Sequence, residues 1–334
     1  MPRVTIRELA KQLGLSTAAV SKALRDSHEI SNATKERVRE LAQRLHFVPN
    51  AYAGSLRRKQ SGNIALVLPE VADSFFSQVI NGIESIAEEK GYHVLIYLTH
   101  EKLAKEQAIL SNLLNGRVDG VLISVSEETT DTSHLQWLAD AGIPLVFFDR
   151  IGSNIPAAKI TTNDRESACL ATETLLQKGC RRIALLSVST ELSITRERIA
   201  GFREALDTQT VSSGVVLDCG RQAECYTEKI RALLEAHDRP DGIIASVEKL
   251  AAPVYTACRE CALKIPEEVQ LICFSNIGTA DFFSPSLSTI SQPAFDMGRE
   301  AARTLFGILD KKIKDPQGIA RVLPSAFICR GSTR

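Results

Sequence analysis

Residues 4–24 read VTIRELAKQLGLSTAAVSKAL, a pattern typical of two short helices joined by a tight turn. Thr5 is followed three residues later by Glu8, which is the signature of a capping box at a helix start. Apolar residues then repeat at helical spacing, at Ile6, Leu9, Ala10 and Leu13. Gly14 is a typical helix stop, and Ser16 is a typical cap for the next helix. The stretch therefore predicts a helix-turn-helix.

The second helix of a helix-turn-helix is the one that enters the major groove of DNA. Here we expect it to span Thr17–Leu24. Its outward side chains, and one residue just beyond it, are the candidates for base contacts: Thr17, Ala18, Ser21, Lys22 and Arg25. Hydroxyl-bearing residues near the predicted helix starts suit phosphate contacts: Thr5, Ser16, Ser31 and Thr34. A third helix opens at Ser31. The alternative is an ordinary three-helix bundle that binds no nucleic acid.

The charges of the chain are unevenly spread. The 334 residues hold 40 Lys and Arg against 40 Asp and Glu. Residues 1–60 contain twelve basic and five acidic residues, a net charge of +7, so the remainder carries −7. A basic head on an acidic body favours a polyanion-binding module joined to a second unit. The alternative is a solvated basic surface without a partner.

Residues 49–59, PNAYAGSLRRK, predict a helix that is marginal on its own. Pro49 suits the first helical position, whereas Gly54 weakens the helix by about 1 kcal/mol relative to alanine. Leu56 is the one large aliphatic side chain in this basic segment, so we expect it either to pack into a hydrophobic core or to insert between two base pairs of DNA. We expect a partner to order this segment, and residues 59–62 to form a linker.

From Asn63 onward, apolar runs of strand length alternate with amphipathic helical patterns. Predicted strands lie at 64–68, 93–98, 118–124, 143–148, 182–187, 214–217, 242–245, 269–274 and 326–329. Predicted helices lie at 76–90, 103–114, 133–141, 167–177, 197–206, 223–234 and 250–262. Such alternation is typical of parallel sheets covered on both faces, and its two cycles predict two doubly wound α/β lobes. Ligands of this architecture bind at the carboxyl ends of strands, between the lobes.

Several stretches together resemble the head of the LacI/GalR family of bacterial transcription regulators: 4–10, 14–16, 20–24, 47–51 and 55–56. The resemblance continues through nearly the whole chain. It implies a homodimer whose helix-turn-helices read two half-sites of a palindromic operator. It also implies paired hinge helices that insert Leu56 and its symmetry mate into the minor groove. Further DNA contacts implied by the resemblance are Arg7, Asn50, Ala53, Leu56 and Arg57.

Two residues in or just after the second helix of the helix-turn-helix depart from the family pattern. Lys22 stands where the family most often has Arg, and Arg25 stands where it most often has Asn. Lysine is a point donor and cannot make the bidentate contact to guanine that arginine makes. We therefore expect Arg25 or Arg7 to supply part of the operator specificity.

The body is similar to a periplasmic sugar-binding protein, which implies an effector site between its lobes. The implied effector contacts are Phe75, Phe76, Asp149, Arg150, Asn163, Asp164, Arg196, Arg198, Glu248, Ser275 and Gln292. Ser275 replaces the usual Asp, and Glu248 lies in a pair that replaces the usual Asn-Asp. Carboxylates, amides and a flat aromatic ring suit a polyol. Because Arg196 and Arg198 would also suit a carboxylate or phosphate, an acidic or phosphorylated sugar stays open.

We expect three parts in the chain. A helix-turn-helix domain occupies residues 1–48, a hinge helix and linker 49–62, and a ligand-binding and dimerisation core 63–334. Within the core, the N-terminal lobe takes about 63–161 and 293–323, and the C-terminal lobe about 162–291 and 324–334. No terminal leucine heptad is present, so a dimer is expected.

The sequence gives no support for catalysis, a cofactor or a metal. It holds no P-loop, G-x-G-x-x-G or G-x-S-x-G motif, and Cys258 and Cys261 form a lone C-x-x-C. No secretory signal or membrane-length segment is visible, so a cytoplasmic location with reduced cysteines is expected. The function indicated is a sugar-responsive transcription regulator, with repression as the family default. The alternatives are a solute-binding protein or sugar-processing enzyme of the same fold, or a DNA-binding protein with a ligand-silent core.

Overall fold

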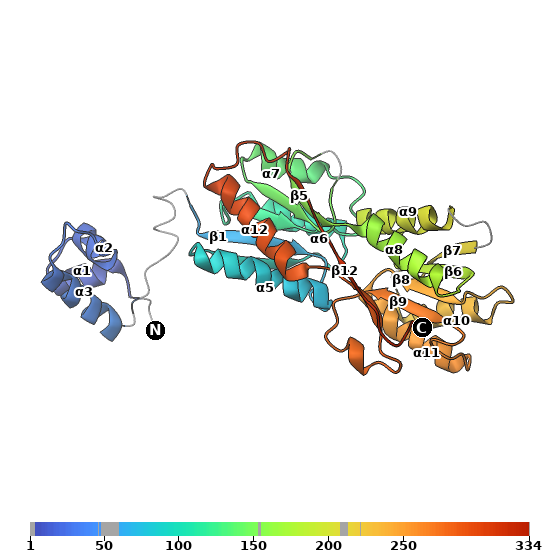
Figure 1. The fold of residues 1–334 in the computed structure, drawn as a ribbon. Helices are drawn as coiled ribbons and strands as arrows, with labels where there is room; N and C mark the ends of the chain where they lie inside the picture. Colours follow the sequence, from blue (N-terminus) through green and yellow to red (C-terminus); the bar gives the residue numbers. More distant parts are fainter. Residues whose placement is uncertain are drawn as a thin grey trace. The chain divides into compact units, whose positions relative to one another are not determined.

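The computed structural model describes residues 4–45, 47, 60–152, 155–207, 213–220 and 222–333. The chain divides into two compact units, Met1–Ser61 and Gly62–Arg334, which are described separately (Figure 1). Over the described residues, no helix combines the length and the apolar character needed to cross a membrane.

The first unit is the helical head, which contains α1 (Ile6–Leu13), α2 (Thr17–Leu24) and α3 (Asn32–Arg44). The predicted capping box is present, because Thr5 and Glu8 each bond the other's backbone N–H. Gly14 ends α1 in the left-handed conformation with a φ of 65°, as a glycine stop requires. The three helices bury one small apolar core: Leu9, Ala10, Val20, Ala23, Val38, Leu41 and Ala42. The predicted helix-turn-helix is confirmed.

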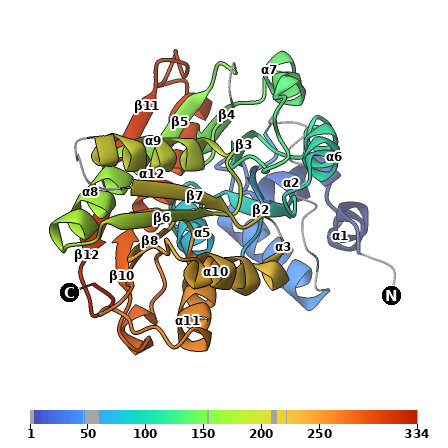
Figure 2. The same ribbon diagram turned by 90° about the vertical axis from the view of Figure 1, so that its right-hand side faces the viewer.

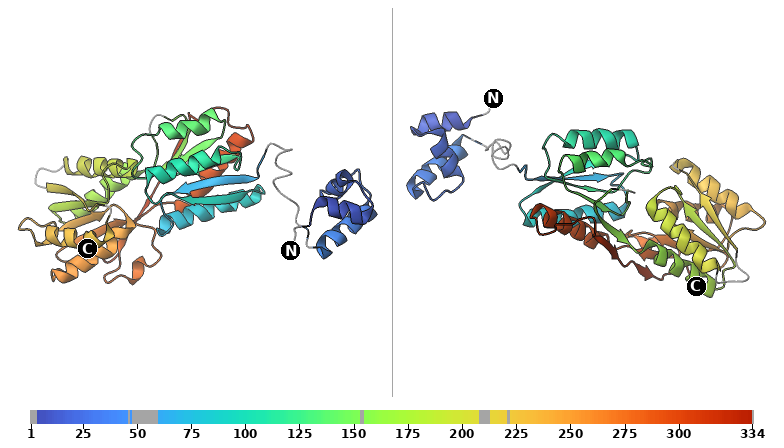
Figure 3. Two further views of the ribbon diagram at one scale, coloured as in Figure 1. Left: turned by 180° about the vertical axis from the view of Figure 1, so that it is seen from behind. Right: turned by 90° about the horizontal axis from the view of Figure 1, so that it is seen from above.

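The second unit, the core, begins with a six-stranded parallel sheet in the order β11-β5-β4-β3-β1-β2. The strands are β1 (Asn63–Leu68), β2 (His93–Leu98), β3 (Gly120–Ile123), β4 (Leu145–Phe148), β5 (Ala158–Thr162) and β11 (Ala320–Leu323). Helices α5 (Ser74–Glu89) and α12 (Ala294–Leu309) cover one face. The other face carries α6 (Leu103–Leu113), the 3-10 turn η1 (Ser133–Leu135) and α7 (Gln136–Asp140) (Figure 3). This three-layer body is the N-terminal lobe.

The C-terminal lobe is built around the second sheet, in the order β12-β10-β9-β8-β6-β7. Its strands are β6 (Arg182–Ser187), β7 (Ser213–Asp218), β8 (Gly242–Ala245), β9 (Gln270–Phe274), β10 (Ser288–Ser291) and β12 (Ala326–Ile328). Helices α8 (Asp164–Gln177) and α9 (Ser193–Asp207) cover one face, and α10 (Tyr226–Glu235) and α11 (Ala251–Glu260) the other (Figure 2). Short 3-10 turns are η2 (Ala223–Cys225), η3 (Glu248–Leu250) and η4 (Ala280–Phe282).

Both lobes confirm the doubly wound prediction, because strand residues alternate between two apolar layers. Ile64 and Leu66 of β1 face α5 and α12, whereas Ala65 and Val67 face α6 and α7. One detail departs from the expected parallel sheets: β12 pairs with β10 in the antiparallel direction.

Some elements differ from the predicted ranges. Helix α8 begins at Asp164 and α9 at Ser193, each earlier than predicted. Three strands and one long helix were not predicted at all, namely β5, β10, β11 and α12, and neither was the short turn η4. These three strands lack a continuous apolar run, because β5 alternates buried and half-buried residues, β10 reads STIS and β11 contains Arg321.

The chain passes between the two sheets three times: from β5 to α8, from β10 to α12, and from β11 to β12. The three crossings are hydrogen-bonded to one another. Asn163 Oδ1 accepts from Ser325 N at 2.7 Å, which joins the first crossing to the third. Gln292 Nε2 donates to Thr162 Oγ1 at 3.1 Å, which joins the second to the first. These crossing hydrogen bonds connect the lobes at the carboxyl ends of several strands.

Candidate functional site

A small central cavity lies between the lobes. Both lobes line it, with the start of α5 and the end of β4 on one side, and α9 and the ends of β8 and β9 on the other. Eight of the predicted effector contacts are among its lining residues: Phe75, Phe76, Asp149, Arg150, Arg198, Glu248, Ser275 and Gln292. Its volume is about 30 Å³, which is the room of about one water molecule. A sugar-sized ligand therefore requires the lobes or these side chains to move apart.

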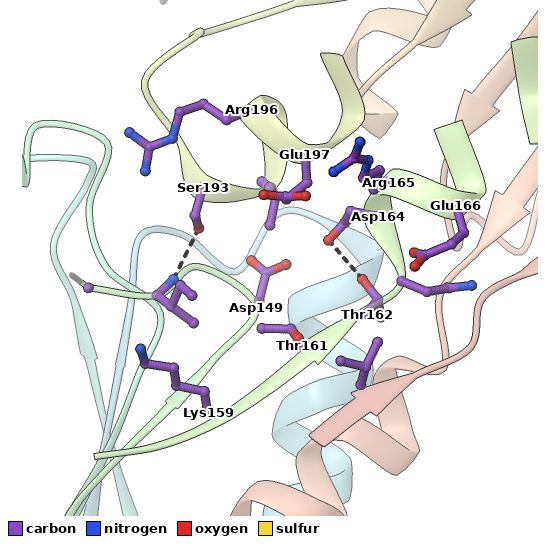
Figure 4. Close-up of a pocket in the computed structure, with 15 residues that line it drawn as sticks. Asp149, Lys159, Thr161, Thr162, Asp164, Arg165, Glu166, Ser193, Arg196 and Glu197 are labelled. Atoms are coloured by element: carbon purple, nitrogen blue, oxygen red, sulfur yellow. Dashed lines mark hydrogen bonds between the residues drawn. The ribbon is translucent and has the colours of Figure 1, made fainter. Parts of the chain in front are cut away.

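A larger cavity of about 610 Å³ adjoins the central one, since Asp149 and Ile194 line both (Figure 4). It contains the three remaining predicted contacts, Asn163, Asp164 and Arg196. Figure 4 shows the Asp149 carboxyl near the middle of this space, with Arg196 above it and Lys159 below it. The structure thus brings all the predicted effector residues to two connected cavities.

Arg198 is a buried arginine whose charge is fully matched. Its guanidinium contacts Asp164 Oδ1 from Nε at 2.7 Å and from Nη2 at 2.6 Å. Nη1 donates to the carbonyl of Ser246, and the group lies over the Phe274 ring at 4.1 Å from the centroid. Arg198 therefore acts as a fixed wall of the central cavity.

Arg196 does not share this position. It is exposed and lines the larger cavity and a third one of about 220 Å³, not the central cavity. Arg196 and Arg198, which together would suit an anionic group, line different cavities, because helical residues two apart point to different sides.

Arg150 faces the central cavity from the N-terminal lobe. Its Nη1 donates to both carboxylate oxygens of Glu101 at 2.8 Å. Its guanidinium also lies 5.9 Å from the centroid of the Phe76 ring. Within the described residues, Arg150 Nε is buried and makes no hydrogen bond. A buried N–H without an acceptor costs free energy, so this atom favours a ligand oxygen.

Asp149 combines burial with an uncommon backbone conformation. Its φ of 57° is left-handed, a conformation that few non-glycine residues adopt and that Asp and Asn tolerate better than most. Burial raises the pKa of its carboxyl to about 7, and the nearby Asp164 and Asp73 carboxylates act in the same direction against Arg150 and Arg198. Ser124 Oγ donates to Oδ2 at 3.3 Å. The carboxyl can therefore change protonation state near neutral pH.

Glu248 bridges the cleft. In its own lobe, Oε2 accepts from Ser275 Oγ at 2.7 Å and from the N–H of Asn276 at 3.2 Å. From the other lobe, Ser74 donates its hydroxyl to Oε2 and its N–H to Oε1, the latter at 3.3 Å. A carboxylate from position 248 thus lies beside Ser275, where the resemblance implied a carboxylate at 275 itself.

Sequence reasoning missed several residues of the central cavity. Asp73 caps α5 by accepting from Phe75 N at 2.9 Å, and burial raises the pKa of its carboxyl. Asn276 exchanges hydrogen bonds with Gln78 across the cleft, each at 3.3 Å. An Asp directly before a helical pattern is a capping signal that could have drawn attention to Asp73. Glu101, the partner of Arg150, carried no such signal.

In the head, Thr17 and Ala18 are exposed, and Ser21 and Lys22 are half-buried. Arg25 folds back onto α2, because its Nε and Nη2 donate to the carbonyl and hydroxyl of Ser21, both at 3.0 Å. Lys22 pairs with Glu29 on the surface. Such exposed pairs contribute little and are readily exchanged for a phosphate or base.

Three of the four hydroxyls predicted to contact phosphate serve as helix caps, and the fourth, Thr34 Oγ1, lies 2.9 Å from Ser31 Oγ. Ser16 accepts from Ala19 N at 3.1 Å, and Ser31 accepts from Thr34 N at 3.3 Å. Thr5 caps α1 in the same way. A capping hydroxyl accepts from the helix, and the Ser16 O–H keeps its own hydrogen to donate. The hinge candidates Asn50, Ala53, Leu56 and Arg57 lie outside the described residues.

Among the described residues, no group of three or more His, Cys, Asp or Glu has the geometry to hold a metal ion. The thiols of Cys258 and Cys273 are buried, and burial raises the pKa of Cys258 to about 12.

Comparison with known proteins gives two family matches. Residues 5–50 match the model described as bacterial regulatory proteins, lacI family, and residues 172–333 match the periplasmic binding protein-like domain. The chain is 31% identical to the ribose operon repressor of Halalkalibacterium halodurans over 99% of this chain and 97% of that protein.

Two solved structures share the fold. A lac repressor dimer bound to operator and the anti-inducer ONPF has a TM-score of 0.86 and 22% identity, covering 99% of both chains. A LacI family transcriptional regulator from Enterococcus faecium with bound ribose has a TM-score of 0.72 and 25% identity, covering 81% of this chain and 98% of that one.

Proposed function

This chain belongs to the LacI family of bacterial regulatory proteins, and from that membership we propose that it is a homodimeric repressor whose operator affinity is set by a small hydroxyl-rich effector. The observation that carries the proposal is the central cavity, which eight predicted contact residues from both lobes line together. We propose that the chain acts in the cytoplasm and catalyses no reaction. The alignment over nearly its whole length favours a regulator over an exported solute carrier of the same fold.

In the proposed complex, α2 of each protomer lies in the major groove of one half-site. The exposed Thr17 and Ala18 are small and can contact few base edges, so longer side chains must supply part of the sequence specificity. Arg25 reaches bases by giving up its two hydrogen bonds to Ser21. The hydroxyls at the starts of α1, α2 and α3 contact phosphates and fix the register of the head.

Effector binding changes how the two lobes close. The three chain crossings, joined to one another by the hydrogen bonds of Asn163 and Gln292, keep the lobes attached, while opening of the cleft would break contacts such as Glu248–Ser74. Displacement of one N-terminal lobe relative to its mate in the dimer alters the spacing of the hinge segments, and operator affinity changes with it. The E. faecium regulator with bound ribose and the ribose operon repressor support a sugar-like effector.

The test begins with the operator, selected from random DNA with the purified full-length chain. Fluorescence anisotropy then gives operator affinity with and without each sugar that raises the thermal stability of the protein. The proposal expects a palindromic operator and at least one sugar that changes operator affinity tenfold or more. A protein that selects no sequence, or one that no sugar-like compound affects, contradicts it.

A further inference from the structure

The central cavity has an excess of negative charge that no part of the proposed function explains. Three carboxyl groups line it, from Asp73, Asp149 and Glu248, together with the guanidinium groups of Arg150 and Arg198. Both arginines already have acidic partners that do not line this cavity, Glu101 for Arg150 and Asp164 for Arg198. Five carboxyl groups therefore surround two guanidinium groups.

The ionisation of these groups reflects the excess. Beyond burial, Glu248 and Glu70 raise the pKa of Asp73, and Asp164 and Asp73 raise the pKa of Asp149. A positive charge placed in the cavity would favour the ionised form of each carboxyl, whereas a phosphate or carboxylate would add to the repulsion.

The polar atoms of the cavity indicate two different ligand groups. Arg150 Nε is buried and makes no hydrogen bond among the described residues, and it lies 3.8 Å from Asp149 Oδ2, so it can donate to a ligand oxygen such as that of a hydroxyl. Glu248 accepts hydrogen bonds from donors of both lobes, and it lines the cavity from the C-terminal lobe whereas Arg150 lines it from the N-terminal lobe. A ligand that replaces Ser74 at Glu248 must itself donate, as a hydroxyl or an ammonium group does.

Aromatic rings complete the lining. Phe75 and Phe76 pack edge to face with centroids 5.3 Å apart, and the Phe274 ring already lies against Arg198. Ring faces bind apolar sugar surfaces and also attract cations.

We propose that the effector is a polyol that carries a protonated amine, and that Glu248, with Asp73 and Asp149, selects it against anionic sugars. The hydroxyls bond Arg150 and the amides of Asn276 and Gln292, and the ammonium group pairs with Glu248. This inference rests on the proposed function, because it names the ligand class of the same cleft. It excludes a phosphorylated or acidic sugar as the effector, a class of ligand that Arg196 and Arg198 had left open.

The experiment is isothermal titration calorimetry at pH 7 with the full-length protein. The probes are glucosamine, galactosamine and mannosamine, each beside its parent hexose and the hexose 6-phosphate. We expect at least one hexosamine to bind tenfold or more tightly than its parent hexose, and every 6-phosphate to bind more weakly than both. A hexose or 6-phosphate that binds as tightly as every hexosamine overturns the assignment, as does a failure of all hexosamines to bind.

Variants assign the preference to Glu248. Glu248→Gln keeps the hydrogen-bonding shape but removes the charge, so the hexosamine-to-hexose affinity ratio should fall about tenfold, and Glu248→Asp should keep most of it. Glu228→Gln, an exposed change on α10 in the same lobe, should leave the ratio unchanged. An unchanged ratio in Glu248→Gln overturns the role of Glu248.

Operator binding of the same preparations separates the two claims. A protein that binds its operator and responds only to neutral or phosphorylated sugars keeps the proposed function and loses the amine assignment. A protein that selects no operator loses the proposed function instead.

Discussion

Asp149 has a carboxyl group whose protonation the cleft controls. Its pKa is about 7 in the folded protein, against an ordinary value of 3.8. Between these two pH values the folded state binds more protons at this site than the unfolded state does. Stability contributed by this residue is therefore full below about pH 4 and is lost as the pH rises toward 7.

Replacing Asp149 with asparagine should remove this loss of stability at higher pH. Asparagine tolerates the left-handed backbone at this position and cannot ionise. We expect Asp149→Asn to be more stable than the parent by on the order of 2–4 kcal/mol at pH 8, with the advantage shrinking toward pH 4. Urea unfolding across this pH range measures it, with the exposed Asp238→Asn as control. A gain of the same size at every pH would contradict the assignment.

Arg25 is the residue most able to add base readout to α2. Arg25→Ala should weaken binding to the selected operator by about 1–3 kcal/mol, and the variant should accept a wider range of operator sequences. Arg37→Ala removes the same charge from the exposed surface of α3, and it should lower the affinity for all DNA sequences equally. Anisotropy with the operator and with random DNA distinguishes the two effects.

Arg7→Ala belongs in the same series, because Arg7 is exposed on α1 and was predicted to share this role. If Arg25→Ala and Arg7→Ala both leave the preferred operator sequence unchanged, neither arginine contributes to specificity.

At the scale of elements, α8 and α9 approach so closely that one position accepts only glycine. A Cβ added at Gly201 would lie 1.9 Å from the carbonyl oxygen of Arg165 and 3.0 Å from Cys169 N. Backbone atoms of a helix cannot yield as a flexible side chain can, so the helices would have to separate.

Gly201→Ala should therefore destabilise the core by about 1–3 kcal/mol and lower the Tm by on the order of 5 °C. The matched control is Gly278→Ala in the same lobe, where an added Cβ meets no heavy atom within 4 Å. Differential scanning calorimetry compares them. Equal Tm values for the two variants would show that the α8–α9 contact tolerates the extra carbon.

The elements that sequence predicted well are those defined by neighbouring residues. Thr5, Glu8 and Gly14 determine α1 through contacts three or four residues apart, so their pattern is visible in the chain. Strands such as β1 and β6 are continuous apolar runs, because both faces of the sheet are covered.

The rest could not be predicted, because it depends on partners far along the chain. β10 has four residues and is recognisable only beside β9 and β12. The contact between Glu248 and Ser74 joins residues 174 positions apart, and no local pattern indicates it. The eleven effector positions came from the family resemblance, whereas their division between two cavities came from the structure.

In the proposed function, the two-lobed core of the molecule binds the effector in its cleft, and the helical head binds DNA. Three crossings joined by the hydrogen bonds of Asn163 and Gln292 let the lobes move without separating. If the cleft controls the head, the coupling must act in both directions, because linkage is reciprocal.

The most direct measurement is a closed thermodynamic cycle on the full-length protein. Operator affinity is measured with and without saturating effector, and effector affinity with and without saturating operator. The account predicts the same factor from both pairs, on the order of tenfold or more, which is about 1.4 kcal/mol of coupling. An effector affinity that is identical with and without operator would contradict it.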